Sequence, residues 1–298
     1  MIYLHFIVNP ISGKGKHKID KMFLANFFPP SKYNIEIDFS KYKKHAILLT
    51  QEAIVQKPDM IVACGGDGTI NEVASELINV PIALGIIPLG SGNGLASNLN
   101  ISRDIKKAIA NIKAHRIKTI DVGRVNNCYF FSNMGLGIDA LIIKKYEENK
   151  QRTLSAYLKA IMKSIVTYTP PRVKIHDNHG EIIISPFLLF ISNSNEMGYK
   201  MSLTPRANLC DGVLDVFVIP KTTIFYTLYL GILVLIGKID RIYKAQKYQT
   251  QSIKIEVLDT KETYLQIDGE FHHFLTNKLK ISVLPSALKI VVGRSFKG

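Results

Sequence analysis

The sequence predicts a doubly wound α/β domain with a parallel sheet, followed by a second domain built mainly of β-strands. Short apolar runs alternate with helical segments as far as Lys118, an order typical of right-handed parallel sheets. Beyond Lys118 the chain changes to short strands with turn signals, beginning with a hairpin around Asn126-Asn127. We therefore place a domain boundary at residues 120/121.

The elements follow from hydrophobic periodicity and from glycine and proline breaks. In the first domain we expect strands at 2–8, 35–39, 60–63 and 82–87, and helices at 17–28, 45–56, 71–77 and 105–112. Beyond Lys118 we expect strands at 119–125, 129–133, 173–175, 181–184, 187–192, 252–257 and 264–267, and a last strand at 288–292 that returns to the first domain.

Composition limits the class of protein. The chain has 298 residues, 47% of them hydrophobic and 21% charged, as in a folded globular protein of one large or two ordinary domains. Three cysteines, Cys64, Cys128 and Cys210, have no paired spacing, which predicts a reducing compartment and neither a disulfide framework nor a zinc site. The first ten residues are typical of a strand and not of a signal peptide.

The formal net charge of +14 predicts an acidic partner. Lysine supplies most of this charge, arginine is sparse, and no nucleic-acid motif is present. We therefore expect an anionic membrane surface and no nucleic acid. The alternative is a soluble protein that merely has a basic isoelectric point.

Three predicted strands run into glycine-rich loops: NPISGKGK at 9–16, GGDGT at 65–69 and PLGSGNGLA at 88–96. Loops after parallel strands lie at the same edge of the sheet, where ligands bind. Glycines let the backbone approach an anion, and the first N–H groups of a following helix point toward it. Asp67 would repel a polyphosphate unless a divalent cation or a hydroxyl to deprotonate lies between them. The alternative is a tight turn in which Asp67 caps the helix.

The pair GGDGT-x-NEV and PLGSGNGLA resembles the lipid kinase family that includes bacterial diacylglycerol kinases and eukaryotic sphingosine and ceramide kinases. GGDGT alone is shared with NAD kinases and phosphofructokinases, whereas the full pair is specific. Ser97 departs from many relatives, which have arginine there. The resemblance implies ATP binding by Asn9, Ser12, Gly13, Gly65, Gly66, Gly68, Thr69, Gly90, Ser91, Gly92 and Asn93.

Further motifs of the family follow in order along the chain. The resemblance implies that Asp121 of T-I-D-V-G supports catalysis and that Asp139 of N-x-G-x-G-x-D-A contacts the lipid head group. Asp67 and Glu270 are the candidate base and Mg²⁺-network carboxylates, with roles that the sequence does not separate. The resemblance also makes Asp211 and Asp215 of D-G-x-L-D-V, and Asp268 of D-G-E, candidate Mg²⁺ ligands. The alternatives are a helix cap for Asp139 and ordinary turns for the others.

Two segments have membrane character. Residues 154–165 predict a basic amphipathic helix, which more often packs on a core. Residues 222–237 are the most apolar stretch and fall short of the ~20 residues that span a bilayer. Lys238, Arg241, Lys244 and Lys247 follow directly. We expect an interfacial or buried helix there. We also expect a cytoplasmic protein that associates peripherally with the inner face of the membrane.

Taken with the resemblance, the sequence predicts a nucleotide-binding domain at 1–120 and a β-sandwich-like lipid-substrate domain at 121–286. Residues 287–298 are expected to return to the first domain, and the active site to lie in the cleft between domains. The predicted reaction is transfer of the γ-phosphoryl group of MgATP to a hydroxyl of a membrane lipid, either diacylglycerol or a sphingoid-type lipid. A soluble kinase similar to NAD kinase and a non-enzymatic anionic-surface binder are the alternatives, and a homodimer is left open.

Overall fold

The structure is a computed structural model that describes residues 1–15, 17–90, 92–148, 164–165, 168–178, 180–196 and 202–296. The chain divides into two compact units: unit 1 is Met1–Val122 with Pro285–Gly298, and unit 2 is Gly123–Leu284. Strands β5 (Ile117–Val125) and β16 (Lys278–Val291) therefore each contribute residues to both units. The sequence prediction set the boundary after residue 120 and the return of the chain at residue 287.

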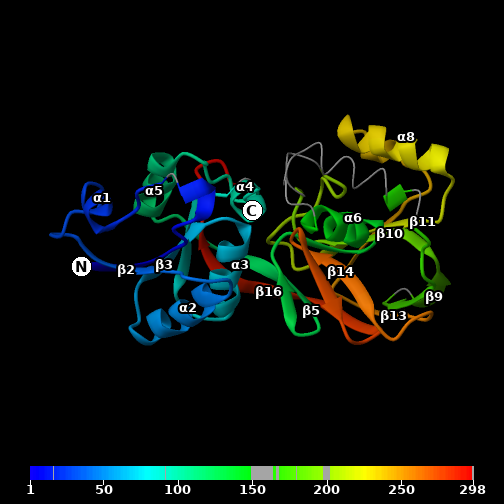
Figure 1. Cartoon of the computed structure of the whole chain (residues 1–298), viewed down its shortest axis with the longest axis horizontal. Coiled ribbons are helices and arrows are strands. Elements are labelled where there is room, and N and C mark those ends of the chain that lie inside the picture. Colours follow the sequence, from blue (N-terminus) through cyan, green and yellow to red (C-terminus); the bar gives the residue numbers. More distant parts are fainter. Residues whose placement is uncertain are drawn as a thin grey trace. The chain divides into compact units, whose positions relative to one another are not determined.

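Unit 1 contains the predicted parallel sheet, which the structure confirms. Its order is β2-β1-β3-β4, and the end of β16 pairs in parallel with β4. Helices α2 and α3 pack against each other on one side of the sheet, and α1 and α5 lie on the other (Figure 1). The strands are β1 (Ile2–Val8), β2 (Tyr33–Phe39), β3 (Met60–Gly65) and β4 (Ala83–Pro88), and the helices are η1 (Ser12–Gly15), α1 (Lys21–Ala25), α2 (His45–Val55), α3 (Asp67–Glu76), α4 (Gly94–Asn98) and α5 (Ile105–Ala114).

The helix predicted at 17–28 is much shorter than expected. Asp20 has extended backbone angles, and its side chain accepts a hydrogen bond from the Phe23 amide, so α1 begins only at Lys21. Such a cap satisfies one of the N–H groups that a helix start leaves without a partner. The periodicity at 17–20 therefore belongs to the loop that leads into the helix.

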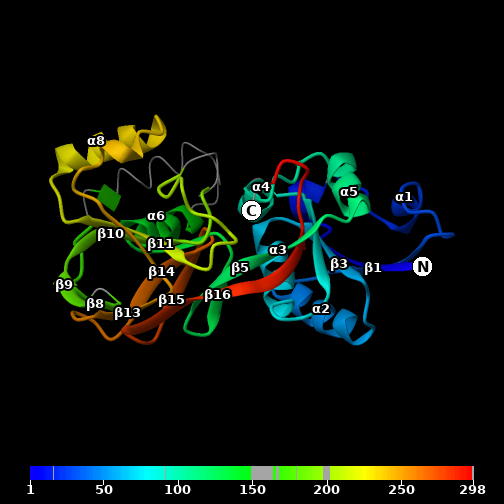
Figure 2. The ribbon, with the colours of Figure 1, turned by 180° about the vertical axis from the view of Figure 1, so that it is seen from behind.

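Unit 2 contains an antiparallel sheet of order β12-β11-β10-β7-β14-β15 and a second antiparallel layer in which β16, β13, β8 and β9 are neighbours (Figure 2). Strands β5 and β6 form the predicted hairpin, with Val125 opposite Cys128. The elements are β6 (Cys128–Phe130), β7 (Asn133–Gly137), α6 (Ile138–Glu147), β8 (Val173–Asp177), β9 (Gly180–Ile184), β10 (Pro186–Ser192), β11 (Leu214–Pro220), α8 (Ile224–Leu235), η2 (Ile239–Arg241), β12 (Gln246–Thr250), β13 (Ser252–Val257), β14 (Thr263–Ile267) and β15 (Glu270–Phe274).

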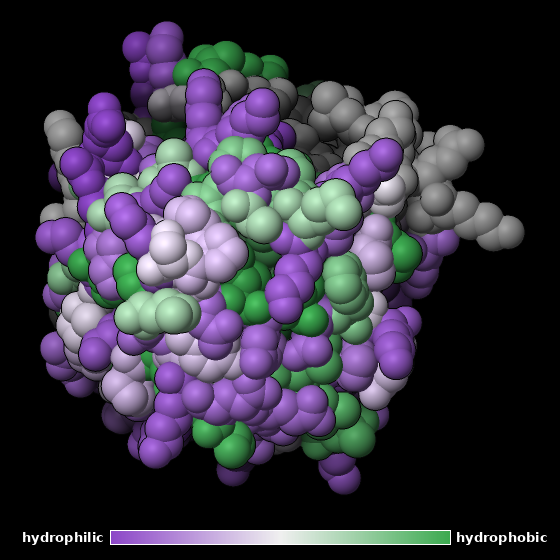
Figure 3. Space-filling view, turned by 90° about the vertical axis from the view of Figure 1, so that its left-hand side faces the viewer, coloured by the Kyte–Doolittle hydropathy of each residue, from purple (hydrophilic) through white to green (hydrophobic). Residues whose placement is uncertain are grey.

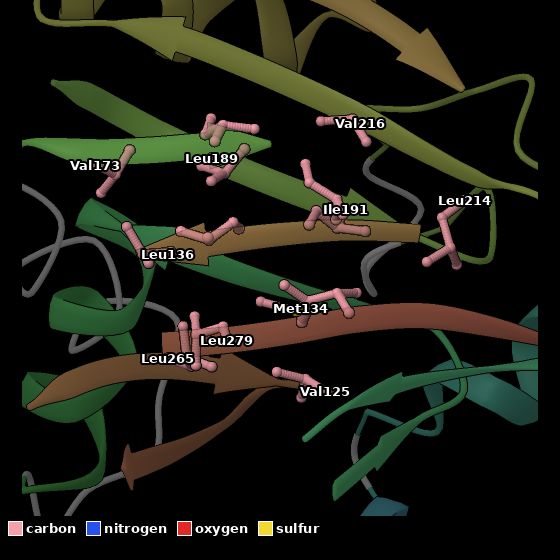
Figure 4. Close-up of a cluster of buried hydrophobic side chains, with 14 of the residues drawn as sticks. Val125, Met134, Leu136, Val173, Leu189, Ile191, Leu214, Val216, Leu265 and Leu279 are labelled. Atoms are coloured by element: carbon pink, nitrogen blue, oxygen red, sulfur yellow. The ribbon is translucent and has the colours of Figure 1, made fainter. Parts of the chain in front are cut away.

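Strand β10 of the six-stranded sheet is buried on both faces. Leu189 and Ile191 point into the core between the two antiparallel layers (Figure 4), whereas Leu188 and Phe190 point into a second core under helices α6 and α8. Because successive side chains of a strand alternate between faces, a continuous apolar run serves both cores. This arrangement confirms the predicted β-sandwich-like domain.

Helix α8 coincides with the apolar stretch predicted at 222–237. Among the described helices, none combines the length and the apolarity that crossing a bilayer requires. The amphipathic helix predicted at 154–165 lies outside the described residues, except for residues 164–165.

Candidate active site

The three glycine-rich loops of unit 1 meet at the carboxyl edge of its parallel sheet. The backbone N–H of Asn9 donates to the Cys64 carbonyl at 2.9 Å, and its side-chain amide donates to the Thr69 hydroxyl at 3.0 Å. The Leu89 N–H donates to the Gly65 carbonyl at 2.7 Å. The loops after β1, β3 and β4 are therefore hydrogen-bonded to one another.

Asp67 joins the second loop to the third. Its two carboxylate oxygens accept hydrogen bonds from the Asn93 and Gly94 amides, each at 2.7 Å. Gly66, not Asp67, caps helix α3, and Asp67 occupies the first helical position. A Cβ on Gly92 would lie 2.5 Å from an Asp67 oxygen, so only glycine allows this approach. Asp67 thus holds the backbone of Asn93 and Gly94 in the third loop.

Helix α3 turns its N-terminus to the same edge. The amides of its first turn, at Asp67, Gly68 and Thr69, have no partner within the helix, and an α-helix N-terminus attracts anions. Ser12 and Gly13 lie in η1 after β1, and Asn93 adopts a left-handed conformation with φ of 57°. Such backbone amides fit a nucleotide polyphosphate. Ser91, also predicted to bind ATP, lies outside the described residues.

Asp121 lies on β5 and is 2% exposed. Its carboxylate accepts a hydrogen bond from the Ser286 amide at 2.7 Å. Ser286 has a positive φ of 51°, which few residues other than glycine and asparagine adopt. Asp121 therefore stabilises an irregular backbone position within β16.

Asp139 is the second residue of α6 in unit 2. One carboxylate oxygen accepts the Ala140 amide at 2.9 Å, and the other is buried without a hydrogen-bond partner among the described residues. Burial raises the pKa of Asp139 to about 7, although the hydrogen bond from the Ala140 amide acts in the opposite direction. The Tyr168 hydroxyl nearby is also buried without such a partner; burial, and then the Asp139 charge, raise its pKa.

The raised pKa of Asp139 gives folding a defined pH dependence. An aspartate in the unfolded chain has a pKa of about 3.9. Between that value and 7 the folded protein binds the proton more tightly, so this stabilisation is complete below about pH 4 and is lost as the pH rises through 7. We expect the free energy of unfolding of the wild type to fall relative to Asp139→Asn over that window, by at most about 4 kcal/mol. Urea titrations from pH 5 to 8.5 measure this, and parallel curves would contradict it.

Gly135 provides the space for the Asp139 carboxyl group. A Cβ at Gly135 would lie 1.4 Å from the unpartnered Asp139 oxygen. We expect Gly135→Ala to lower the free energy of unfolding by about 1–3 kcal/mol, as overpacking does. Gly231→Ala in α8, where a Cβ meets nothing within 4 Å, is the control and should not destabilise. An equal cost of Gly135→Ala in an Asp139→Ala background would contradict this reason.

The D-G-E turn is held against β7. The Asp268 carboxylate accepts three backbone amides, from Phe131 and Ser132 at 2.8 Å and from Asn133 at 3.0 Å. Glu270 follows as the first residue of β15. These hydrogen bonds fix the turn that precedes Glu270. Because the Asp268 carboxylate already accepts three backbone amides, few of its lone pairs remain for another ligand.

Asp211 precedes strand β11, and Asp215 is the second residue of that strand. The two carboxylates are close enough to interact electrostatically. Asp211 accepts the Val213 amide at 3.2 Å. Burial, and to a lesser extent the Asp211 charge, raise the pKa of Asp215, whereas Gln249 lowers it. In the part of the chain that the structure describes, no cluster of three or more Asp, Glu, His or Cys residues could hold a metal ion. Mg²⁺ often uses one or two carboxylates with water, so the pair fits this ion.

A cavity of about 290 Å³ lies within unit 2, lined mainly by apolar and aromatic groups. Tyr168 forms part of its wall, together with Leu136, Leu141, Val257, Tyr264 and Phe271. At the same cavity the Lys144 ammonium lies 5.2 Å from the centroid of the Tyr264 ring. The cavity therefore combines an apolar wall with a cation and a buried hydroxyl.

Three residues of these sites were missed in the sequence. Gln266 donates to the Asn133 side chain at 2.8 Å and accepts the Gly269 amide at 2.9 Å, so it joins two motifs. Arg103 donates to the Gly92 carbonyl at 2.7 Å and so contacts the third glycine-rich loop. Tyr168 is the third. Only Gln266 had a signal, because it lies directly before the D-G-E motif.

Family models match both parts of the chain. Residues 3–125 match the diacylglycerol kinase catalytic domain, and residues 132–292 match the YegS C-terminal NAD kinase beta sandwich-like domain. A diacylglycerol kinase from Bacillus subtilis is 30% identical over 89% of this chain and 88% of its own length. The chain belongs to the diacylglycerol kinase family. This lipid kinase is also 26% identical to a diacylglycerol kinase from Staphylococcus carnosus, over 89% of this chain and 87% of the relative.

The fold of this lipid kinase agrees with solved structures. A crystal structure of a diacylglycerol kinase from Bacillus anthracis matches it with a TM-score of 0.74, covering 99% of this chain and 98% of the other. The two sequences are 23% identical, so this likeness concerns the fold. Membership of the family establishes a kinase, and a kinase of this family uses ATP.

Proposed function

We propose that this lipid kinase transfers the γ-phosphoryl group of MgATP to a hydroxyl of a membrane lipid, either diacylglycerol or a sphingoid-type lipid. One observation carries the proposal: hydrogen bonds through Asn9 and Asp67 join three glycine-rich loops at one edge of the sheet. Phosphoryl transfer depends mainly on positioning and charge stabilisation, and converging backbone amides supply both.

On the nucleotide side, the backbone amides of Gly66, Gly68, Thr69 and Gly92 bind the phosphates. Asn9 and Asn93 act as positioning residues, since each holds a loop in place. Gly13, Gly65 and Gly90 keep the backbones close, and Ser12 and Ser91 complete the pocket. Asp121 has a supporting role through the backbone of β16.

On the acceptor side, Asp139 and Tyr168 receive the polar head of the lipid. Both present buried polar atoms that lack a partner in the described residues, and such atoms are costly unless a ligand or water satisfies them. The cavity beside Tyr168 accommodates apolar atoms next to that head.

Glu270 accepts the proton of the lipid hydroxyl. The hydroxyl oxygen then bonds to the γ-phosphorus while the bond from that phosphorus to the ADP oxygen breaks. Asp67 directs its oxygens to the Asn93 and Gly94 amides, so we assign it to holding the phosphate loop and to the Mg²⁺ network. Mg²⁺ bound there would neutralise charge on the phosphates. A second Mg²⁺ held by Asp211 and Asp215 would be structural; Asp268, bonded to three amides, is the weakest candidate ligand.

This lipid kinase works peripherally on the anionic inner face of the membrane, from the cytoplasmic side. The net charge of +14 supports this placement, and so does the spacing of the three cysteines, which predicts no disulfide framework.

Radiolabelled ATP with a panel of diacylglycerol, sphingoid base, ceramide, phosphatidylglycerol and NAD tests the proposal. Label in diacylglycerol or in a sphingoid lipid supports it and names the substrate. The match of residues 132–292 to an NAD kinase beta sandwich-like domain favours one second candidate, phosphorylation of NAD. Label in NAD alone would replace the proposal with that candidate.

A further inference from the structure

Helix α8 exposes large apolar side chains on its solvent side. The exposed fractions are 82% for Phe225, 43% for Tyr229 and 55% for both Ile232 and Ile236. Ile236 follows the last residue of α8, and its amide donates to the Ile232 carbonyl at 3.0 Å, which continues the helical turn. A single exposed apolar residue needs no explanation, but four on one helix do.

These four residues lie on one face. They are spaced by four, three and four positions, and at 3.6 residues per turn they fall within about 60° of arc. Another side of the helix is already occupied, because Leu230 and Leu233 are 4% and 3% exposed in the core over the six-stranded sheet. The exposed face is therefore not needed to attach α8 to its own unit.

Cations flank α8 on both sides along the chain. Lys221 precedes α8, and Lys238, Arg241, Lys244 and Lys247 follow it; all are exposed, and Asp240 is the one acidic residue of 221–247. Lys244 lies 4.7 Å from the centroid of the Tyr226 ring and 5.9 Å from that of the exposed Tyr243. Tyrosine and lysine beside an apolar face are typical of segments at the boundary between lipid head groups and acyl chains.

Exposed apolar side chains in unit 1 are distributed differently. Ile11, Met22 and Val55 are 78–82% exposed but belong to a loop, to α1 and to α2. On the face drawn in Figure 3, hydrophobic residues are scattered among hydrophilic ones. The α8 face differs because its apolar residues lie on one side of a single helix, and cations flank that helix along the chain.

We propose that the face formed by Phe225, Tyr229, Ile232 and Ile236, named here the α8 face, docks onto an anionic membrane with the helix axis parallel to the membrane plane. Twelve residues of helix are about 18 Å long, too short to cross the hydrocarbon core. The cations select a negatively charged leaflet over a second copy of this basic chain. The proposal rests on the proposed function for its lipid substrate, and it adds the surface by which the enzyme reaches that substrate.

The chain contains no tryptophan, which makes a direct test simple. Phe225→Trp places one fluorophore on the α8 face, and Leu275→Trp places it on an equally exposed position, 82%, after β15. With vesicles of phosphatidylglycerol and phosphatidylcholine, we expect a blue shift and quenching by brominated acyl chains for the Phe225→Trp variant only. Equal responses of the two variants, or no response of Phe225→Trp, would overturn the proposal.

The double variant Phe225→Ser/Ile232→Ser tests the energetics, with Leu275→Ser as the matched control. We expect the double variant to partition onto these vesicles about tenfold or more weakly than the wild type, because two large apolar groups no longer insert. The Leu275→Ser control should partition as the wild type does. Unchanged partitioning, or wild-type self-association in sedimentation that the double variant abolishes without vesicles, would overturn the docking role.

Phosphorylation of detergent-dispersed short-chain diacylglycerol separates the two proposals. We expect the double variant to retain this activity while losing activity on vesicles. Failure of wild type and variant on every dispersed lipid, with vesicle binding intact, would remove the proposed function and leave the α8 face standing. Equal loss on dispersed and vesicle substrate would overturn the docking role.

Discussion

Asp67→Asn is expected to lower phosphorylation by ATP at least about 100-fold while the protein stays folded. The carboxylate accepts the Asn93 and Gly94 amides at 2.7 Å, and an asparagine would direct an N–H₂ group at one of them. Hydrogen bonds to a charged group are worth about 1.5–3 kcal/mol each, and a hundredfold change needs about 2.7 kcal/mol. We expect the KM for ATP to rise as well, since the loop that binds phosphate loses its anchor.

Asp59→Asn is the matched control for this prediction. Asp59 also accepts a backbone amide in unit 1, that of Tyr3 at 2.7 Å, but it precedes β3, so it lies at the opposite edge of the sheet from the glycine loops. It should leave turnover and KM unchanged. Circular dichroism and thermal unfolding check that Asp67→Asn is folded. Wild-type turnover in Asp67→Asn would remove Asp67 from the site.

The sheet of unit 1 could be predicted because its evidence is local. Each buried strand is a short apolar run, each ends in glycines, and parallel order then brings the three loops to one edge. The partners of Asp67 could not be predicted, since they lie 26 and 27 positions away and are backbone amides, which have no sequence signature. The same limit hid Arg103, whose contact is a carbonyl.

The D-G-E motif illustrates a different limit. The sequence alone does not distinguish three carboxylates of the family motifs, those of Asp139, Asp268 and Glu270. In the structure their surroundings differ. Asp268 accepts three amides, whereas Asp139 retains a buried oxygen without a partner in the described residues. Burial and hydrogen bonding decide what a carboxylate can do, and both depend on strands that pair across more than a hundred residues.

Glu270→Gln is expected to lower kcat about 100-fold or more with little change in the KM for ATP. Removal of a general base typically costs 10²–10⁴-fold, and glutamine preserves the size and hydrogen-bonding reach of the side chain but cannot take the hydroxyl proton. The turn beneath it should stay intact, because Asp268 still holds the Phe131, Ser132 and Asn133 amides.

A comparison of kcat and of the KM for ATP in the two variants tests whether Asp67 and Glu270 have different roles. Asp67→Asn should raise the KM for ATP and lower kcat, whereas Glu270→Gln should lower kcat alone, since it removes an interaction made with the acceptor hydroxyl. Glu181→Gln is the control in the same unit; its carboxylate pairs with Lys174 at 2.9 Å, and its loss should leave kcat unchanged. A Glu270→Gln enzyme with wild-type kcat, or with the same rise in KM as Asp67→Asn, would show that another group accepts the proton.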